Sequence, residues 1–283
     1  MAFKKIGLAV TFSPNSRALL FEAKRFSELF NTELVLIHIG DFTDELKNEM
    51  IKMIKETGLK EDSYKLLWRD GDVEDSILEF CSTEKIDLLI AGALIKENFL
   101  KYYIGSVART LMREAPCSVL LLTQPSIERA PFKKVCVSVD FTSLSELAAK
   151  KAYEISSLLN SKELFFIREF QLPALATTVY DSGSKEEAQS MRHVWLDEEK
   201  SKMELFVREL NLPGAEIKTI CLYGKQGWEA SNWVNENKGD LFVIPSPARK
   251  PKLLDRIFQH DWEFVFRQLP CSLLIVKPDD DSL

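Results

Sequence analysis

Apolar runs of five to seven residues alternate along the chain with stretches in which apolar residues recur every three or four positions. Uninterrupted apolar runs are typical of strands in a parallel sheet covered on both faces, whereas the longer spacing is typical of amphipathic helices. The pattern therefore predicts alternating strands and helices, which fold as a doubly wound α/β sheet. The first part of the chain contains predicted strands at 6–11, 33–39, 64–68, 87–91 and 117–122, and predicted helices at 15–30, 43–57, 73–83 and 104–114.

The beginning and the end of this unit recur later in the chain. The sequence KKIGLAVTFS from Lys4 returns as KKVCVSVDFT from Lys133, and PCSVLLL from Pro116 returns as PCSLLIV from Pro270. The offset grows from 129 residues at the first pair to 154 at the second, so the second copy carries about 25 additional residues in its middle. Two matched segments in the same order indicate a tandem duplication.

The duplication predicts two domains with the same fold, at 1–124 and 132–283. Each is expected to be a five-stranded, mainly parallel, Rossmann-like sheet with helices on both faces. Residues 125–131, bracketed by prolines, form the predicted linker.

The additional length of the second copy falls between 172 and 212. Residues 172–184 are rich in small and turn-forming types and are predicted to be a loop, and 185–210 is predicted to be a long helix. A lid over a site and an enlarged surface loop are the two interpretations of this expansion.

The charge balance disfavours one class of partner. Lys and Arg number 37 against 43 Asp and Glu, for a net charge of −6, whereas proteins that bind nucleic acid without sequence preference need a basic face. No apolar run approaches the roughly 18 residues of a membrane helix, and the first residues lack the pattern of a secretory signal. We therefore expect a cytoplasmic protein with neither a nucleic-acid nor a membrane partner.

Cysteine and histidine spacing supports no metal site and no catalytic site. The five cysteines include no Cys-x-x-Cys and are expected to be small buried hydrophobic residues in a reducing compartment. No pair of the three histidines has metal-ligand spacing. No Gly-x-Ser-x-Gly sequence supports a hydrolase. We expect no catalytic residues and no metal.

A glycine pattern follows the predicted strand at 87–91. The chain reads Gly-Ala-Leu-Ile from Gly92 to Ile95, and after nine further residues Gly105 and Ser106 follow. Glycine lets backbone amides approach a phosphate closely and allows a positive φ, and a helix N-terminus adds partial positive charge. Since the next predicted helix begins near Gly105, its amides and the Ser106 hydroxyl form a candidate phosphate site.

This pattern resembles the nucleotide loop of the universal stress protein family, Gly-x2-Gly-x9-Gly-Ser/Thr. The two repeats, the strand order, the Asp-Leu before the loop and the Pro-Cys-Ser before the last strand extend the resemblance over nearly the whole chain. It implies an adenine nucleotide alpha hydrolase-like fold and ATP or AMP binding in the first domain, through Thr11, Gly92, Gly105 and Ser106. The sequence departs from the family at the middle glycine, which is Ile95, and at the tip of the first strand, where Thr11 replaces an Asp.

The second copy has the family's Asp, as Asp140, but lacks the loop. Pro245 and Pro247 stand in place of its glycines, and proline has no amide to donate to a phosphate. Nucleotide binding is therefore expected in the first domain alone. The alternative hypothesis is a purely structural or interaction protein with two degenerate nucleotide sites, in which Gly92, Gly105 and Ser106 are turn and N-cap residues.

The resemblance implies a non-enzymatic regulator or scaffold of the stress response that acts on an unknown protein partner. Family members pair their last strands across a dimer, so the segments from Cys117 to Leu122 and from Cys271 to Val276 are expected to form an internal pseudo-dimer. Whether two chains associate further as a homodimer is left open.

A nucleotide-utilising enzyme of the same superfamily is the third hypothesis. It rests on the fold and on His38-Ile39-Gly40-Asp41, which partly matches the His-x-Gly-His motif of adenylyl-transferring enzymes. A fold alone does not establish a reaction. We interpret His38 as a strand residue and Gly40 as the turn that follows it.

Overall fold

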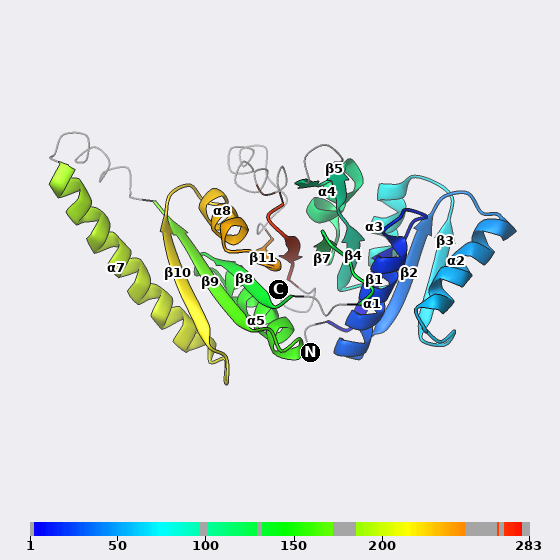
Figure 1. The fold of residues 1–283 in the computed structure, drawn as a ribbon, viewed down its shortest axis with the longest axis horizontal. Coiled ribbons are helices and arrows are strands. Elements are labelled where there is room, and N and C mark those ends of the chain that lie inside the picture. The colour runs from blue at the N-terminus through cyan, green and yellow to red at the C-terminus, as the bar shows by residue number, and fades with distance from the viewer. Residues whose placement is uncertain are drawn as a thin grey trace.

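The computed structural model describes residues 3–96, 101–128, 132–171, 185–246, 265 and 269–278, and the structural statements below concern these residues. Ten strands form one sheet in the order β10-β9-β8-β11-β12-β7-β4-β1-β2-β3 (Figure 1). Five adjacent strands come from the first part of the chain, the N-terminal unit, and five from the second part, the C-terminal unit. The predicted α/β fold with a mainly parallel sheet is confirmed.

The N-terminal unit contains nine elements of the predicted alternation and a short hairpin, β5-β6, between β4 and α4. Its elements are β1 (Lys5–Ala9), α1 (Ser16–Phe30), β2 (Glu33–Ile39), α2 (Asp44–Glu56), β3 (Tyr64–Arg69), α3 (Val73–Thr83), β4 (Leu88–Gly92), β5 (Leu94–Lys96), β6 (Lys101–Tyr103), α4 (Ser106–Glu114) and β7 (Ser118–Leu122).

The C-terminal unit follows the same order over its described residues. Its elements are β8 (Lys134–Val139), α5 (Ser143–Leu158), β9 (Glu163–Phe170), α7 (Lys185–Leu210), β10 (Ile217–Tyr223), α8 (Trp228–Glu236), β11 (Leu241–Pro245) and β12 (Ser272–Val276). Helix α7 stands where α2 stands in the N-terminal unit and has 26 residues against 13 (Figure 1). The predicted long helix is confirmed, and the predicted loop at 172–184 lies outside the described residues.

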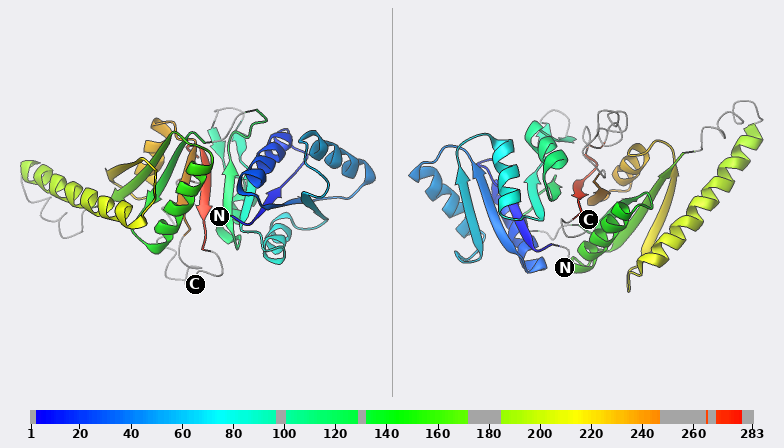
Figure 2. Two further views of the ribbon diagram at one scale, coloured as in Figure 1. Left: turned by 90° about the horizontal axis from the view of Figure 1, so that it is seen from below. Right: turned by 180° about the vertical axis from the view of Figure 1, so that it is seen from behind.

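Alternate residues of the strands face two separate apolar layers. Leu88 and Ile90 of β4 belong to the layer that also contains buried residues of α1, α2, α5 and α7, whereas Leu89 belongs to the layer with those of α3, α4 and α8. Each face of the sheet is thereby covered, as the views from two further directions show (Figure 2). Coverage on both faces explains why the strands are continuous apolar runs.

The two units join through antiparallel pairing of β7 with β12. Leu120 lies opposite Leu274, and these two residues are separated by the repeat offset of 154. A pseudo-two-fold axis therefore passes through this pair. Consistent with it, the Thr123 amide donates to Ser272 Oγ (3.2 Å), and the Lys277 amide donates to Ser118 Oγ (3.1 Å).

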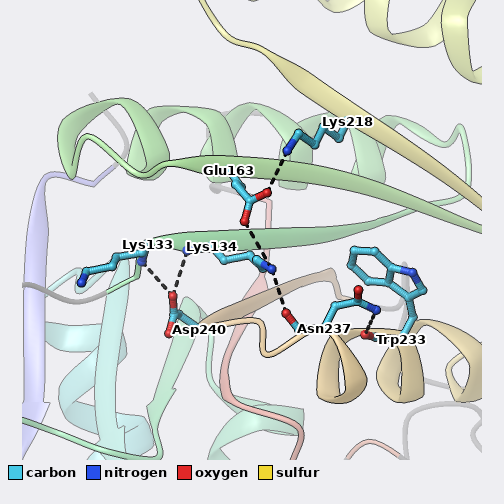
Figure 3. Close-up of polar contacts among 7 residues, drawn as sticks. All are labelled: Lys133, Lys134, Glu163, Lys218, Trp233, Asn237 and Asp240. Atoms are coloured by element: carbon cyan, nitrogen blue, oxygen red, sulfur yellow. Dashed lines mark hydrogen bonds and ion pairs between the residues drawn. The ribbon is translucent and has the colours of Figure 1, made fainter.

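A carboxylate contact recurs at the start of the first strand of each unit. Asp87 accepts hydrogen bonds from the amides of Lys4 and Lys5 at 2.6 and 3.0 Å. Asp240 accepts them from the amides of Lys133 and Lys134, both at 2.9 Å (Figure 3). The Asp-Leu sequence common to both copies thus fixes the entry to the first strand.

Across the described ranges, no helix is both long enough and apolar enough to cross a membrane.

Candidate functional site

The carboxyl ends of β1 and β4 bring two of the four candidate residues to one edge of the sheet. The strands are parallel neighbours with Leu8 opposite Ile90. Gly92 is the last residue of β4, and Thr11 follows β1 by two positions. Ligands of open α/β sheets bind at this edge.

Thr11 takes part in a cluster of hydroxyl groups that closes the turn into α1. Its Oγ1 lies 3.2 Å from Ser16 Oγ and accepts a hydrogen bond from the Ser13 amide at 3.3 Å. Ser13 Oγ lies 3.0 Å from the same Ser16 oxygen. Thr11 is exposed, so its remaining hydrogen-bonding capacity faces solvent. It brings no negative charge to this position.

Gly92 is required by packing rather than by backbone conformation. A Cβ built on Gly92 would lie 2.9 Å from Leu19 Cδ1 of α1. Its φ is not in the positive range, so the backbone conformation does not require glycine here. The absence of a side chain lets α1 lie close against β4.

Gly105 and Ser106 open α4, as predicted, although the helix starts two residues later than the predicted 104. Gly105 is the N-cap residue in an extended conformation, with φ −66° and ψ 170°. Glycine offers no side chain to the first-turn amides, and that turn holds no acidic residue. The uncapped amides of the first turn of α4 and the positive end of the helix dipole are therefore suited to bind an anion. The exposed Ser106 lies at the same place.

Two short paired strands, β5 and β6, lie between the two glycine positions. Ile95 in β5 lies opposite Tyr102 in β6. Extended backbone suits a β-branched residue, which accounts for isoleucine at the family's middle glycine. The structure thus places Thr11 and Gly92 at one strand edge and links Gly105 and Ser106 to it through this hairpin.

Aromatic side chains gather beside Thr11, at the ends of β1, β2 and β3. The ring of His38 lies 4.3 Å from that of Trp68 and 5.0 Å from that of Phe12, centroid to centroid. Phe42 packs edge-on against Trp68 at 5.4 Å and is 57% exposed. This cluster was not predicted from the sequence, although Phe12 and Trp68 both stand at strand ends.

His38 is a strand residue and Gly40 is its turn, as interpreted. The buried His38 ring donates from Nδ1 to the Val10 carbonyl at 2.8 Å. Gly40 has φ +152°, and its carbonyl accepts from Trp68 Nε1 at 3.0 Å. These contacts give His38 and Gly40 a structural role at this edge of the sheet.

In the C-terminal unit, Pro245 occupies the place of Gly92. Pro245 lies opposite Val276 as Gly92 lies opposite Leu122. The next amide, of Ser246, donates to Val276 O at 2.8 Å, which matches the 2.8 Å bond from Ala93 to Leu122. Asp140 accepts from the amide and hydroxyl of Thr142, before α5. Pro247 and the segment opposite Gly105 lie outside the described residues.

Comparison with known proteins finds a family similarity in the N-terminal unit. Residues 2–123 match the model of the universal stress protein family. A universal stress protein of Methanocaldococcus jannaschii is 29% identical over 96 residues, which are 34% of this chain and 55% of that protein. The chain thus spans about half the length of this curated relative.

Solved structures match the fold over nearly the whole chain. A functionally unknown protein from Pseudomonas aeruginosa PAO1 has a TM-score of 0.74 at 18% identity, covering 99% of this chain and 94% of its own. A putative universal stress protein from Pseudomonas aeruginosa UCBPP-PA14 has 0.73 at 20%, covering 99% and 95%. A universal stress protein from Archaeoglobus fulgidus has 0.63 at 16%, covering 96% and 98%. At these identities the similarity establishes the fold.

Proposed function

Since residues 2–123 match the model of the universal stress protein family, we propose that the chain is a tandem, non-enzymatic member of that family. In this proposal the protein is a regulator or scaffold of the stress response, and its N-terminal unit binds AMP or ATP weakly. The remainder of the chain contributes the second, non-binding copy and contacts a protein partner.

The observation that carries the nucleotide proposal is the opening of α4. Gly105 leaves the first-turn amides uncapped, and Ser106 adds an exposed hydroxyl. A phosphate is the ligand that such a helix start favours, because amide donors and the helix dipole act together. The aromatic edge formed by Phe12, Trp68 and Phe42 supplies flat apolar surface for a base near Thr11.

We expect weak binding. In the described residues, β5 and β6 are paired strands at the place of the family's loop, and Thr11 brings no carboxylate to the ribose. The Kd is expected to be on the order of 0.1 mM or higher.

Calorimetric titration of the full chain with AMP and with ATP plus magnesium tests the proposal. In the variant Ser106→Asp a carboxylate at the helix start stabilises α4 and repels phosphate, so the thermal midpoint is kept while binding is lost. The matched control is Ser143→Asp, at the exposed first residue of α5, which leaves binding unchanged. No heat and no midpoint shift at millimolar nucleotide would reject nucleotide binding.

The hairpin and the hydroxyl turn favour a second candidate, a scaffold without a ligand. Ile95 is held in strand pairing, and the Thr11 hydroxyl is engaged with Ser13 and Ser16. Under this candidate Ser106→Asp leaves capture of the protein partner unchanged. Loss of that capture in Ser106→Asp alone would favour the nucleotide-dependent regulator.

A further inference from the structure

A cavity of about 580 Å³ lies at the junction of the two units. It is bordered by the carboxyl end of β7 at Thr123, by the residues leading into β8 and β11, and by the amino end of β12 at Ser272. This volume is within the range of small-molecule sites. It lies apart from Gly105 and Ser106, which are not among its lining residues.

The two acidic groups at the cavity are already engaged. Glu22 is 2% exposed, and its carboxylate binds Arg25 Nη1 at 2.7 Å and accepts from the Ser126 amide at 3.0 Å. Asp240 accepts the amides of Lys133 and Lys134. Neither carboxylate therefore needs a cationic ligand.

Two lysines at the cavity are available to a ligand. Among the described residues, the ammonium groups of Lys133 and Lys238 have no hydrogen-bond or ion-pair partner, and both residues are exposed. Figure 3 shows the Lys133 side chain extending away from Asp240. The neighbouring Lys134 differs, because its ammonium donates to Asn237 O at 2.8 Å and binds Glu163 at 3.2 Å.

The rest of the lining combines polar residues, among them Thr123 and Ser272, with an apolar part. Leu122, Phe132 and Cys271 are buried core residues at the cavity, and Pro270 lies beside them. A ligand with an apolar body can cover this surface, while an acidic group neutralises the two ammonium groups.

The pseudo-two-fold axis relates Thr123, at the cavity, to a lysine on the opposite side of the junction. Lys277 is the equivalent of Thr123 by the repeat offset and by its amide bond to Ser118. Its ammonium donates to the carbonyls of Arg113, at 3.1 Å, and Ala115. The short Thr123 side chain instead pairs with Ser272 Oγ at 3.3 Å and borders the cavity.

We propose that this cavity binds a small organic anion, whose acidic group lies between Lys133 and Lys238 and whose apolar body packs on Leu122 and Phe132. The class comprises carboxylates, phosphates and sulfonates of this form. The site goes beyond the nucleotide site at α4 and does not depend on it.

Fluorescence titration of the full chain with 8-anilinonaphthalene-1-sulfonate, an apolar sulfonate, tests the site. We expect saturable binding, weakened about tenfold by Lys133→Met and by Lys238→Met, because each removes one charge-assisted contact. Lys162→Met is the control, an exposed lysine near β9 that does not line the cavity. Equal affinity in all three variants would overturn the proposal.

A variant that fills the cavity and two compounds that compete with the dye provide further tests of the site. Thr123→Lys introduces the side chain found at the equivalent Lys277, and we expect it to abolish dye binding. If this variant unfolds, the Lys133→Met/Lys238→Met double variant decides instead, with a loss greater than either single change. Octanoate is expected to displace the dye at lower concentration than inorganic phosphate. Displacement by phosphate at equal or lower concentration would reject the apolar body of the ligand.

Discussion

Gly92 shows how one residue can serve packing where its motif points to a ligand. The substitution Gly92→Ala places a Cβ within 2.9 Å of Leu19 Cδ1, so Leu19 or α1 must shift. We expect the free energy of unfolding to fall by about 1–2 kcal/mol in urea denaturation. Gly105→Ala is the matched control, since φ −66° and ψ 170° suit alanine. Equal losses in both variants would contradict this account of Gly92.

The cysteines are expected to react unequally with a thiol reagent. Burial raises the pKa of Cys136 to about 12 and raises that of Cys271 well above its usual value. At pH 8 the thiolate fraction at Cys136 is therefore about one in ten thousand. Cys221 is half-buried.

In the native protein we expect one rapid equivalent with Ellman's reagent, at Cys221, and five after unfolding in urea. The variant Cys221→Ser removes the rapid phase. A rapid native phase that survives in Cys221→Ser would show that a buried thiol is accessible.

At the scale of elements, α7 is attached to the sheet by a charged contact. Arg168 of β9 donates to Glu199 of α7 at 2.7 Å, and Lys202 binds the other Glu199 oxygen at 3.0 Å. Burial raises the pKa of Glu199, but the bonds from Arg168 and Lys202 outweigh it and hold the pKa below its usual value. The stability that Glu199 contributes is therefore present above its unfolded pKa and lost as pH falls through the lower folded pKa.

We expect Glu199→Gln to lower the free energy of unfolding by about 1–3 kcal/mol at pH 7. The difference from the unsubstituted chain is expected to shrink below about pH 4, as both states become protonated. Urea denaturation at a series of pH values measures it. Glu198→Gln is the control, because Glu198 is more exposed and contacts Lys202 alone among its described partners. A loss independent of pH would contradict the charge argument.

The length and regularity of an element decided how well the sequence predicted it. The bounds predicted for β2, α3 and α7 coincide with the structure, because apolar spacing persists through each and capping residues such as Asp72 mark the ends. The β5-β6 hairpin was not predicted, since its three-residue strands are too short to show a period. The two strands lie between Gly92 and Gly105, where the family pattern has its nucleotide loop.

At the scale of the whole molecule, the repeat offset identifies equivalent positions in the two copies. It does not predict how the side chains at those positions differ. The repeat placed Leu120 opposite its own equivalent, Leu274, at the centre of the junction. The offset does not predict the junction cavity, which is bordered by Thr123, whereas the equivalent residue of the other copy is Lys277. Comparison of the two copies in the structure exposes that asymmetry.

The carboxylate contact that recurs in both units allows their contributions to the free energy of unfolding to be compared. Asp87→Ala and Asp240→Ala each remove an acceptor for two backbone amides at the start of a strand. We expect each to lower the free energy of unfolding by about 1–2 kcal/mol, because the amides lose a charged partner. Asp41→Ala is the control, at an exposed position whose carboxylate has no hydrogen bond or ion pair among the described residues.

The double variant Asp87→Ala/Asp240→Ala is expected to show the sum of the two losses within about 0.5 kcal/mol. Additivity follows because the two carboxylates lie in different units and share no hydrogen-bond partner. Both units share one continuous sheet, so urea denaturation should remain a single transition in the double variant. A second transition, or a loss confined to one aspartate, would show that the two units do not use this contact equally.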